Sequence, residues 1–157
     1  MGSSDASFLT RYLPYLLRQA DQTLSAPFHA VLNEYGVARS EWRVLAVLDE
    51  LGEMPVVDLA SAALSPQPTV THAIRRLEKR GLITRTHGTS DKRQRFISIT
   101  TTGAKLTATL IGEAEQLETE LLGEAGDLSD LVNQLRALTE QVEATINSQT
   151  KESSRAG

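Results

Sequence analysis

The stretch QPTVTHAIRRLEKR, residues 67–80, decides the fold, and GLITRT follows it at 81–86. Pro68 fits the first turn of a helix, and Gly81 fits the end of one. The apolar residues of the stretch recur at steps of four and three, which places them on one helical face. They are Val70, Ile74 and Leu77. We therefore expect a helix over 67–80 that buries this face and exposes threonine and arginine on the other.

Short elements surround this helix. Before it, apolar patterns predict short helices at 40–51, with Ser40 as the N-cap, and at 56–63. After it, two β-prone runs at 82–86 and 95–99 are separated by turn-forming residues, which predicts a hairpin with a long loop. Helices joined by tight turns and followed by a hairpin describe a winged helix-turn-helix.

Long helical patterns flank this middle region. The first spans 8–35, where Pro14 fits a first turn and Pro27 predicts a kink or a restart. A second pattern runs from threonines that can cap it, at 100–102, to about 122, and a third carries a heptad-like apolar seam. The seam consists of Leu128, Leu131, Leu135, Leu138 and Val142. The middle region is too small to cover these stripes, so we expect them to pack against a second copy of the chain.

The predicted class is mainly α (α+β), a winged helix-turn-helix with long N- and C-terminal dimerisation helices. From the length of the chain we expect all of 1–157 to form one domain. The winged lobe is expected at about 38–100, the dimerisation helices at about 5–36 and 102–147, and a flexible tail at 148–157.

Composition excludes several classes of protein. The chain has no cysteine, which rules out disulfides, thiolate metal sites and thiol redox switches. The longest stretch without a charged residue, 59–74, contains two prolines and is too short and polar to cross a bilayer. No basic segment precedes an apolar one at the N-terminus. We expect a cytoplasmic protein with no membrane partner.

Charge is distributed unevenly along the chain. The formal net charge is −4, but His72–Arg95 contains eight cations and two acids, a local charge of +6. The other residues carry eight cations and eighteen acids, a charge of −10. A concentrated positive field attracts a polyanion even when the whole chain is acidic.

The exposed face of the helix at 67–80 carries residue types that read DNA in the major groove. Gln67 can pair with adenine, and Arg75 or Arg76 can pair bidentately with guanine. Threonines can contact a phosphate or a thymine methyl group. The candidate contact residues are Gln67, Thr69, Thr71, His72, Arg75, Arg76 and Lys79. The alternative interpretation is a solvated basic helix face.

The hairpin supplies a second basic element. Asp91, Lys92 and Arg93 lie at its predicted tip, and Arg85 and Arg95 lie on its arms. Arginine is favoured in a narrow minor groove, where the negative potential is enhanced. A carboxylate beside phosphate is repelled unless it orients a cation, so we expect Asp91 to orient an arginine. The alternative is a polar turn without function.

Nothing in the sequence indicates an enzyme, a cofactor or a metal site. The three histidines, His29, His72 and His87, fall in separate elements without metal-ligand spacing, and there is no glycine-rich phosphate loop. Acids at 113–120 divide between helical faces, as on a solvated surface.

Several segments, in order and spacing, resemble the MarR family of transcriptional regulators over about 40–103. They include EWRVL (41–45), RLEKRGLI (76–83), DKR (91–93) and ITTTG (99–103). The resemblance implies a homodimer with interlocked terminal helices, whose two winged lobes bind a pseudo-palindromic operator in double-stranded DNA. It also implies that Arg93 enters the minor groove and that Asp91 positions it.

Many MarR-family members release DNA when a small aromatic acid or another lipophilic ligand binds between the dimer region and the DNA lobe. The resemblance therefore implies a repressor with a small-molecule effector. The branch that senses peroxide through a cysteine is excluded, because this chain has none.

A ligand site could involve the only tryptophan, near the junction of the helices. The candidate ligand residues are Tyr15, Arg18, His29, Trp42 and Arg43. Structural alternatives are that Trp42 fills the core, that Arg43 pairs with Glu41 or Asp49, and that His29 is simply exposed.

Two functions remain open. One is a sequence-specific, ligand-responsive dimeric regulator, and the other is a winged module that binds DNA without sequence preference or binds a protein. Gln67, Thr69 and His72 favour the first, because a nonspecific binder needs only lysine and arginine.

Overall fold

The computed structural model describes residues 7–87 and 95–155. The chain divides into two compact units, Met1–Thr119 and Glu120–Gly157, each with its own internal contacts. The first unit contains the winged lobe and most of the long helices. The second contains the end of one helix and a second long helix.

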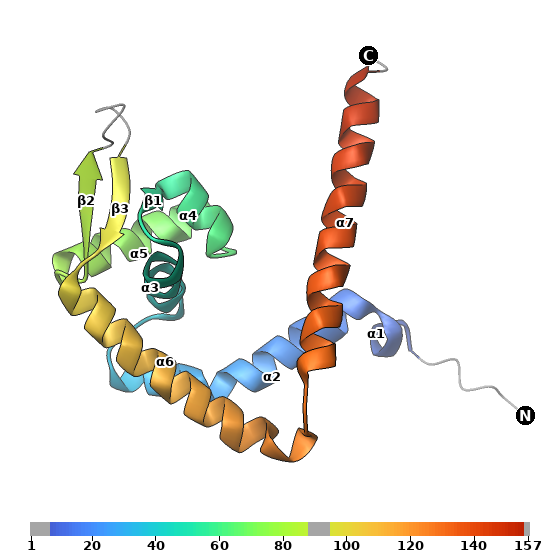
Figure 1. Ribbon diagram of the computed structural model, residues 1–157, viewed down its shortest axis with the longest axis horizontal. Helices are drawn as coiled ribbons and strands as arrows, with labels where there is room; N and C mark the ends of the chain where they lie inside the picture. Colours follow the sequence, from blue (N-terminus) through green and yellow to red (C-terminus); the bar gives the residue numbers. More distant parts are fainter. Residues whose placement is uncertain (1–6, 88–94, 156–157) are drawn as a thin grey trace, which may run out of the picture. The chain divides into compact units, whose positions relative to one another are not determined.

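The elements of the first unit follow the predicted order (Figure 1). They are α1 (Phe8–Arg11), α2 (Leu13–Glu34), α3 (Arg39–Leu51), β1 (Met54–Pro55), α4 (Val56–Ala62), α5 (Gln67–Lys79), β2 (Ile83–His87), β3 (Arg95–Ile99) and α6 (Thr101–Leu122), whose last residues belong to the second unit. The second unit continues with η1 (Gly123–Ala125) and α7 (Ser129–Arg155).

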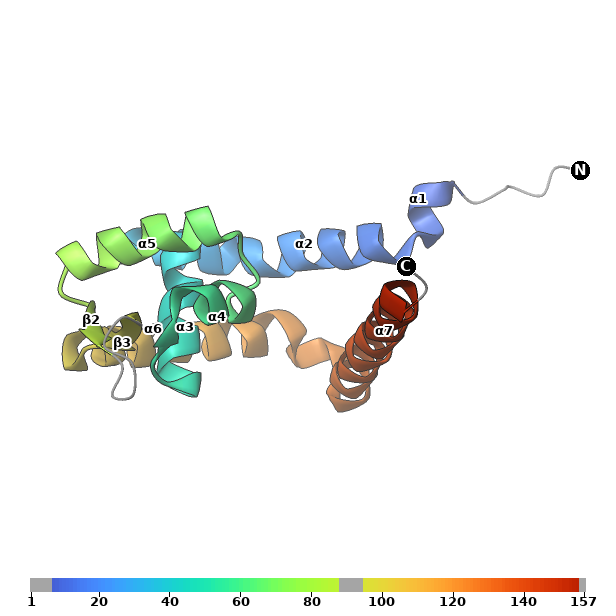
Figure 2. The ribbon, with the colours of Figure 1, turned by 90° about the horizontal axis from the view of Figure 1, so that it is seen from above.

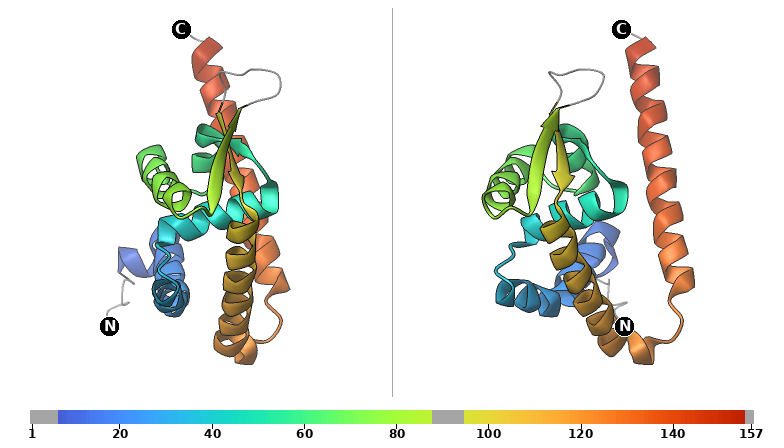
Figure 3. Two further views of the ribbon diagram at one scale, coloured as in Figure 1. Left: turned by 90° about the vertical axis from the view of Figure 1, so that its left-hand side faces the viewer. Right: turned by 60° about the vertical axis from the view of Figure 1, so that its left-hand side comes forward.

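A three-stranded antiparallel sheet closes the winged lobe, with strand order β1-β3-β2. Strands β2 and β3 pair from Ile83 with Ile99 to His87 with Arg95, which confirms the predicted hairpin. Figure 3 shows these two strands side by side. Strand β1 pairs Met54 with Ile97 and was not predicted, because two residues are too few to show an alternating pattern.

The core of the lobe joins α3, α4 and α5 to the sheet. Val70, Ile74 and Leu77 are fully buried, which confirms the predicted inner face of α5. The other members of this core are Val44, Leu45, Leu48, Leu59, Ala60, Ala63, Ala73, Leu82, Ile83 and Ile97. Packing on this side fixes which face of α5 is left to the solvent.

A smaller cluster connects the long helices to α3. Leu32 of α2, Val37 and Leu110 of α6 are buried together, with Phe28 and Trp42 packed against them. The long helices of the first unit are therefore anchored to the base of the lobe.

The start of α6 is fixed by one threonine. Thr100 Oγ1 donates a hydrogen bond to the Gly81 carbonyl and accepts one from the Gly103 amide. This confirms the predicted cap and ties α6 to the end of α5, where Gly81 has a positive φ of 69°.

Three local predictions differ from the structure. The N-cap of α3 is Ala38 rather than Ser40, because Glu41 accepts a hydrogen bond from the Ala38 amide and supplies the cap from the third helical position. Helix α2 continues through Pro27 without a restart, and the residues that follow, Phe28 and Leu32, pack in the cluster that anchors the helix. Helix α7 continues to Arg155, beyond position 148 at which the sequence predicted a flexible tail.

The long helices leave large apolar side chains exposed in each unit. In the first unit many of these residues lie on α1, at its junction with α2 and along α2 up to residue 24: Phe8, Leu9, Tyr12, Leu13, Tyr15, Leu16, Leu17 and Leu24. In the second unit they lie at the end of α6, at Leu121, and on α7: Leu131, Val132, Leu135, Val142 and Ile146. No helix in the described ranges is long and apolar enough to cross a membrane.

The observed class is mainly α with one small sheet, as predicted: a winged helix-turn-helix carrying long helices.

Candidate nucleic-acid interface

Helix α5 lies along one edge of the lobe (Figure 2). Its exposed side carries the predicted contact residues. Gln67, Thr69, His72, Arg75 and Lys79 are exposed, and Thr71 is half-buried. Gln67, Thr71, His72 and Arg75 line a shallow depression of about 460 Å³ together with Pro68. The structure thus brings the polar residues of the helix together on one accessible face.

The N-terminus of α5 can itself attract an anion. The helix begins after Pro66, and no side chain caps its first turn. Pro68 has no N–H, but the other free backbone amides of the first turn point along the axis and, with the helix dipole, favour a phosphate.

The hairpin arms are partly engaged in internal contacts. Arg85 Nε lies 3.1 Å and 3.2 Å from the two carboxylate oxygens of Glu78 on α5, so this arginine braces the hairpin against the helix. Arg95 is exposed at the start of β3. The predicted wing residues Asp91, Lys92 and Arg93 lie outside the described residues.

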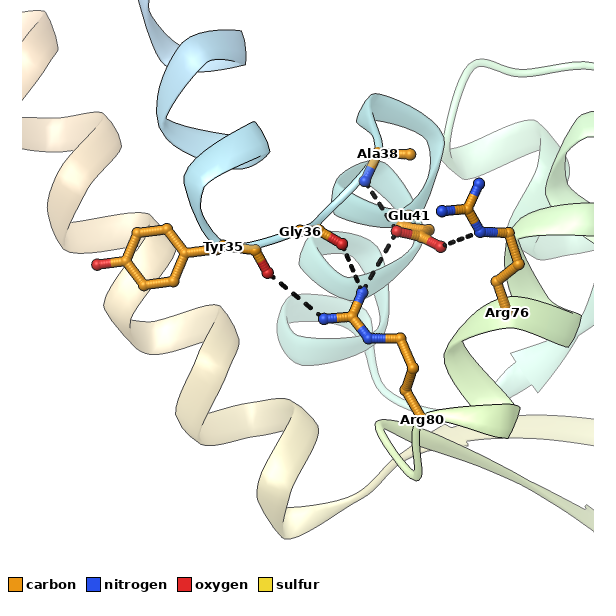
Figure 4. Close-up of polar contacts among 6 residues, drawn as sticks. All are labelled: Tyr35, Gly36, Ala38, Glu41, Arg76 and Arg80. Carbon is orange, nitrogen blue, oxygen red and sulfur yellow. Dashed lines mark hydrogen bonds and ion pairs between the residues drawn. The ribbon is translucent and has the colours of Figure 1, made fainter.

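Arg76 in the last turn of α5 and Arg80 directly after the helix converge on one buried carboxylate (Figure 4). Glu41 is fully buried; its Oε1 lies 2.9 Å from Arg76 Nε, and its Oε2 lies 3.6 Å from Arg80 Nη1. Arg80 also donates to the carbonyl oxygens of Gly36, at 2.8 Å, and Tyr35, at 3.5 Å. Burying a carboxylate is costly unless it is paired, so these contacts fix α5 against α3 and the end of α2.

The sequence analysis did not identify this cluster, and one of its alternatives was wrong. Arg43 pairs with neither Glu41 nor Asp49; its Nη1 donates to Ser65 Oγ at 3.4 Å. Glu41 instead pairs with residues 35 and 39 positions away. Only its place in the motif EWRVL could have drawn attention to it.

A second concave site lies between α2, α3 and the turn before α5. The groove has a volume of about 950 Å³ and contains four of the five candidate ligand residues: Arg18, His29, Trp42 and Arg43. Tyr15 is not among its lining residues, because it lies further toward the N-terminus of α2. Residues that the sequence did not indicate complete the wall: Asp21, Gln22, Ser25, Ala26, Phe28, Arg39, Leu64 and Pro66.

The groove is electropositive with an aromatic base. Trp42 packs edge-on against Phe28, with ring centroids 5.1 Å apart, so it serves both the core and the groove. Burial, and then the positive charge of Arg39, hold the pKa of His29 below its usual value of 6.5, while Asp21 opposes them. A neutral imidazole among three arginines leaves a site that suits an anion with a flat apolar body.

No group of acids and histidines in the described part of the chain is placed to hold a metal ion. The histidines that the sequence placed in separate elements are separate in the structure, on α2, α5 and β2.

Comparisons with known proteins agree with this architecture. The sequence profile of the MarR family matches residues 37–94. The HTH-type transcriptional regulator FarR of Neisseria gonorrhoeae is 31% identical over 135 residues, which are 84% of this chain and 91% of that protein.

Solved structures of known proteins share this architecture. A MarR family transcriptional regulator from Silicibacter pomeroyi is 33% identical, with a TM-score of 0.76 over 87% of this chain and 98% of that one. NadR, solved in complex with 4-hydroxyphenylacetate, is 27% identical, with a TM-score of 0.73 over 90% and 96% of the two chains. The profile matches the winged lobe, and the sequence and structural relatives cover most of the chain, so the protein belongs to the MarR family of transcriptional regulators.

Proposed function

We propose that this regulator is a homodimer that binds a pseudo-palindromic operator in double-stranded DNA and acts as a repressor in the cytoplasm. Each subunit places the outer face of α5 in the major groove, and the hairpin β2–β3, with Arg93 and Asp91 between its strands, reaches the adjacent minor groove. A small aromatic carboxylate bound in the groove between α2 and α3 releases the DNA.

The observation that carries this proposal is the outer face of α5. Gln67, Thr71, His72 and Arg75 meet in one exposed depression beside an uncapped helix N-terminus. Amide and guanidinium groups have the hydrogen-bonding geometry to distinguish bases, whereas lysines alone would support only charge-driven binding. The local charge of +6 in a chain of net charge −4 directs DNA to this face.

Exposed apolar residues support the homodimer. Large apolar side chains are exposed on α1 and α2 in the first unit and on α7 in the second. Contiguous apolar surface of this kind indicates an interface. A two-fold dimer presents two copies of α5, which requires an operator with two related half-sites.

The groove supports an aromatic acid as effector. Arg18, Arg39 and Arg43 supply positive charge for a carboxylate, and Trp42 with Phe28 supplies a flat apolar surface. Guanidinium groups bind carboxylates in a forked geometry. NadR has been solved with 4-hydroxyphenylacetate, a molecule of this chemistry, so that compound is the first one to test.

A binding titration tests the function. Genomic fragments, including the region upstream of the protein's own gene, are titrated against scrambled competitor at two salt concentrations. With about 6–10 phosphate contacts, affinity for the operator falls by about 10³–10⁵ between roughly 50 and 200 mM salt, yet binding still resists competitor. Weak binding that competitor abolishes would instead favour a module without sequence preference.

The same titration tests the effector. 4-Hydroxyphenylacetate is expected to release the bound fragment and to change the fluorescence of Trp42, the only tryptophan. Arg43→Gln should require more ligand for release while leaving operator affinity unchanged. Release at the same ligand concentration in this variant would place the effector elsewhere.

A further inference from the structure

The cluster around Glu41 contains an arginine that the protein uses only in part. Glu41 is fully buried in the first turn of α3, and both its oxygens are paired within the described residues. Oε2 accepts the Ala38 amide at 2.8 Å and lies near Arg80, whereas Oε1 accepts no hydrogen bond and has only the ion pair with Arg76. A buried carboxylate of this kind holds its cations strongly, because losing one leaves a desolvated charge.

The two arginines of the cluster are used differently. Both terminal nitrogens of Arg80 donate to backbone carbonyls, so its terminal edge is engaged by the fold. Arg76 meets Glu41 through Nε, and its terminal nitrogens make no hydrogen bond to the described part of the protein. The Arg76 side chain is 53% exposed, against 36% for Arg80.

The exposed part of Arg76 borders the candidate DNA-binding face. Arg76 follows His72 by four residues and Arg75 by one, so helical geometry places it beside the depression that these residues line. A guanidinium has five N–H donors in a fixed plane, and an Nε contact leaves the terminal edge for a second anion. Holding the side chain in advance reduces the conformational entropy that DNA binding would otherwise cost.

We propose that Glu41 is a positioning residue: it holds Arg76 through Nε so that the terminal guanidinium edge binds a phosphate of the DNA backbone. The ligand is phosphate rather than a base, since Arg76 is anchored at the side of α5 that faces α3. This rests on the proposed operator binding and explains why a fully buried acid lies beneath a DNA-binding helix. It assigns Arg76 a phosphate contact in place of the contact with guanine that the sequence analysis gave as a possibility.

The charge of Glu41 makes the proposal easy to distinguish from a general electrostatic effect. Replacing Glu41 by glutamine removes a negative charge and, by charge alone, would strengthen DNA binding. If Glu41 holds Arg76, the same replacement weakens binding, because Arg76 is no longer fixed. Glutamine keeps an oxygen that can accept the Ala38 amide, so the helix cap is retained.

The experiment is a double-mutant cycle on the full-length protein, with the genomic fragment that the wild type binds most tightly. Arg76→Gln is expected to weaken binding by about tenfold or more, as for the loss of a charged hydrogen bond, and to reduce the salt slope by about one per subunit. Glu41→Gln weakens binding in the wild-type background and has no further effect in the Arg76→Gln background. Lys105→Gln, which removes one exposed cation from α6, serves as the charge control and should leave the slope unchanged.

Three results would overturn the proposal. These are unchanged affinity in Arg76→Gln, stronger binding in Glu41→Gln, or a Glu41→Gln effect of the same size in both backgrounds. The last would mean that Glu41 acts on the placement of α5 through Arg80. Thermal unfolding of each variant confirms that the folded protein is being titrated. Failure of the proposed function shows in the wild type, as the absence of competitor-resistant binding. Failure of the Glu41–Arg76 proposal alone shows only in the variants, so the two failures can be distinguished.

Discussion

At the scale of single residues, charge placement decides which groups remain available for a ligand. Arg80 and Arg85 are basic residues near α5, yet both are bound to acids or carbonyls of the protein itself. Arg75 is exposed, with no ion pair among the described residues. Composition counts all three equally, so local charge overstates how many cations DNA can reach.

His29 gives a prediction at this scale. Burial is the main reason why its pKa is below 6.5 in the folded protein. Between the folded-state pKa and 6.5, the unfolded chain therefore binds more protons than the folded one. The stability that this group supports is therefore complete above pH 6.5 and decreases as the pH falls toward the native pKa. His29→Gln should show a smaller loss of thermal midpoint between about pH 7.5 and 5.5 than the wild type. His72→Gln, which removes an imidazole from an exposed helix face, is the control, and an equal effect there would contradict the assignment.

Single residues also show where sequence reasoning stops. The outer and inner faces of α5 follow from periodicity, and those predictions of burial were confirmed at Val70, Ile74 and Leu77. The role of Glu41 does not follow from periodicity, because its arginine partners lie far away in the chain and neither is on its helix. An acid next to Trp42 at the start of a helix looks like an ordinary first-turn residue until the fold brings Arg76 to it.

At the scale of elements, α6 begins in close contact with the turn after α5. A Cβ at Gly103 would overlap the Leu82 carbonyl oxygen and press on Ile99, so only glycine lets the helix start against the sheet. The sequence motif ITTTG therefore encodes a cap and a close approach together.

A matched pair of substitutions on α6 tests this. Gly103→Ala should destabilise the protein by about 1–3 kcal/mol, as overpacking of a tight contact does. Gly112→Ala, where a Cβ would meet nothing within 4 Å, should stabilise it by about 0.4–1 kcal/mol, since alanine restricts the unfolded chain. Urea unfolding of both variants measures the difference. Similar values for the two would show that the Gly103 contact does not constrain the start of α6.

Element boundaries followed from local signals where those signals were strong. Gly81 and Pro68 marked the ends of α5, and β3 was predicted at the residues that it occupies. The cap of α3 was misplaced because a side chain from within the helix replaced the expected serine. Pro27 did not break α2, since packing of Phe28 and Leu32 against α3 and α6 outweighs one lost hydrogen bond.

At the scale of the whole molecule, the two units differ in how they are stabilised. The first buries a continuous core, whereas α7 has no fully buried residue in its described part. A 27-residue helix with apolar side chains open to water gains little from its own chain. The three- and four-residue spacing of the apolar residues on α7 predicted this seam. What covers the seam does not follow from the sequence of a single chain.

Leu135→Asp tests whether a second copy covers it. Leu135 is 39% exposed in the isolated chain and lies in the middle of the seam, so a buried carboxylate there would oppose association. The variant is expected to sediment as a monomer or to lose solubility, and to lose operator affinity because two linked half-sites are no longer bound together. Asn133→Asp introduces the same charge on the opposite side of α7 and should remain dimeric. Sedimentation velocity at several concentrations measures both, and a stable dimer of Leu135→Asp would place the interface on α1 and α2 instead.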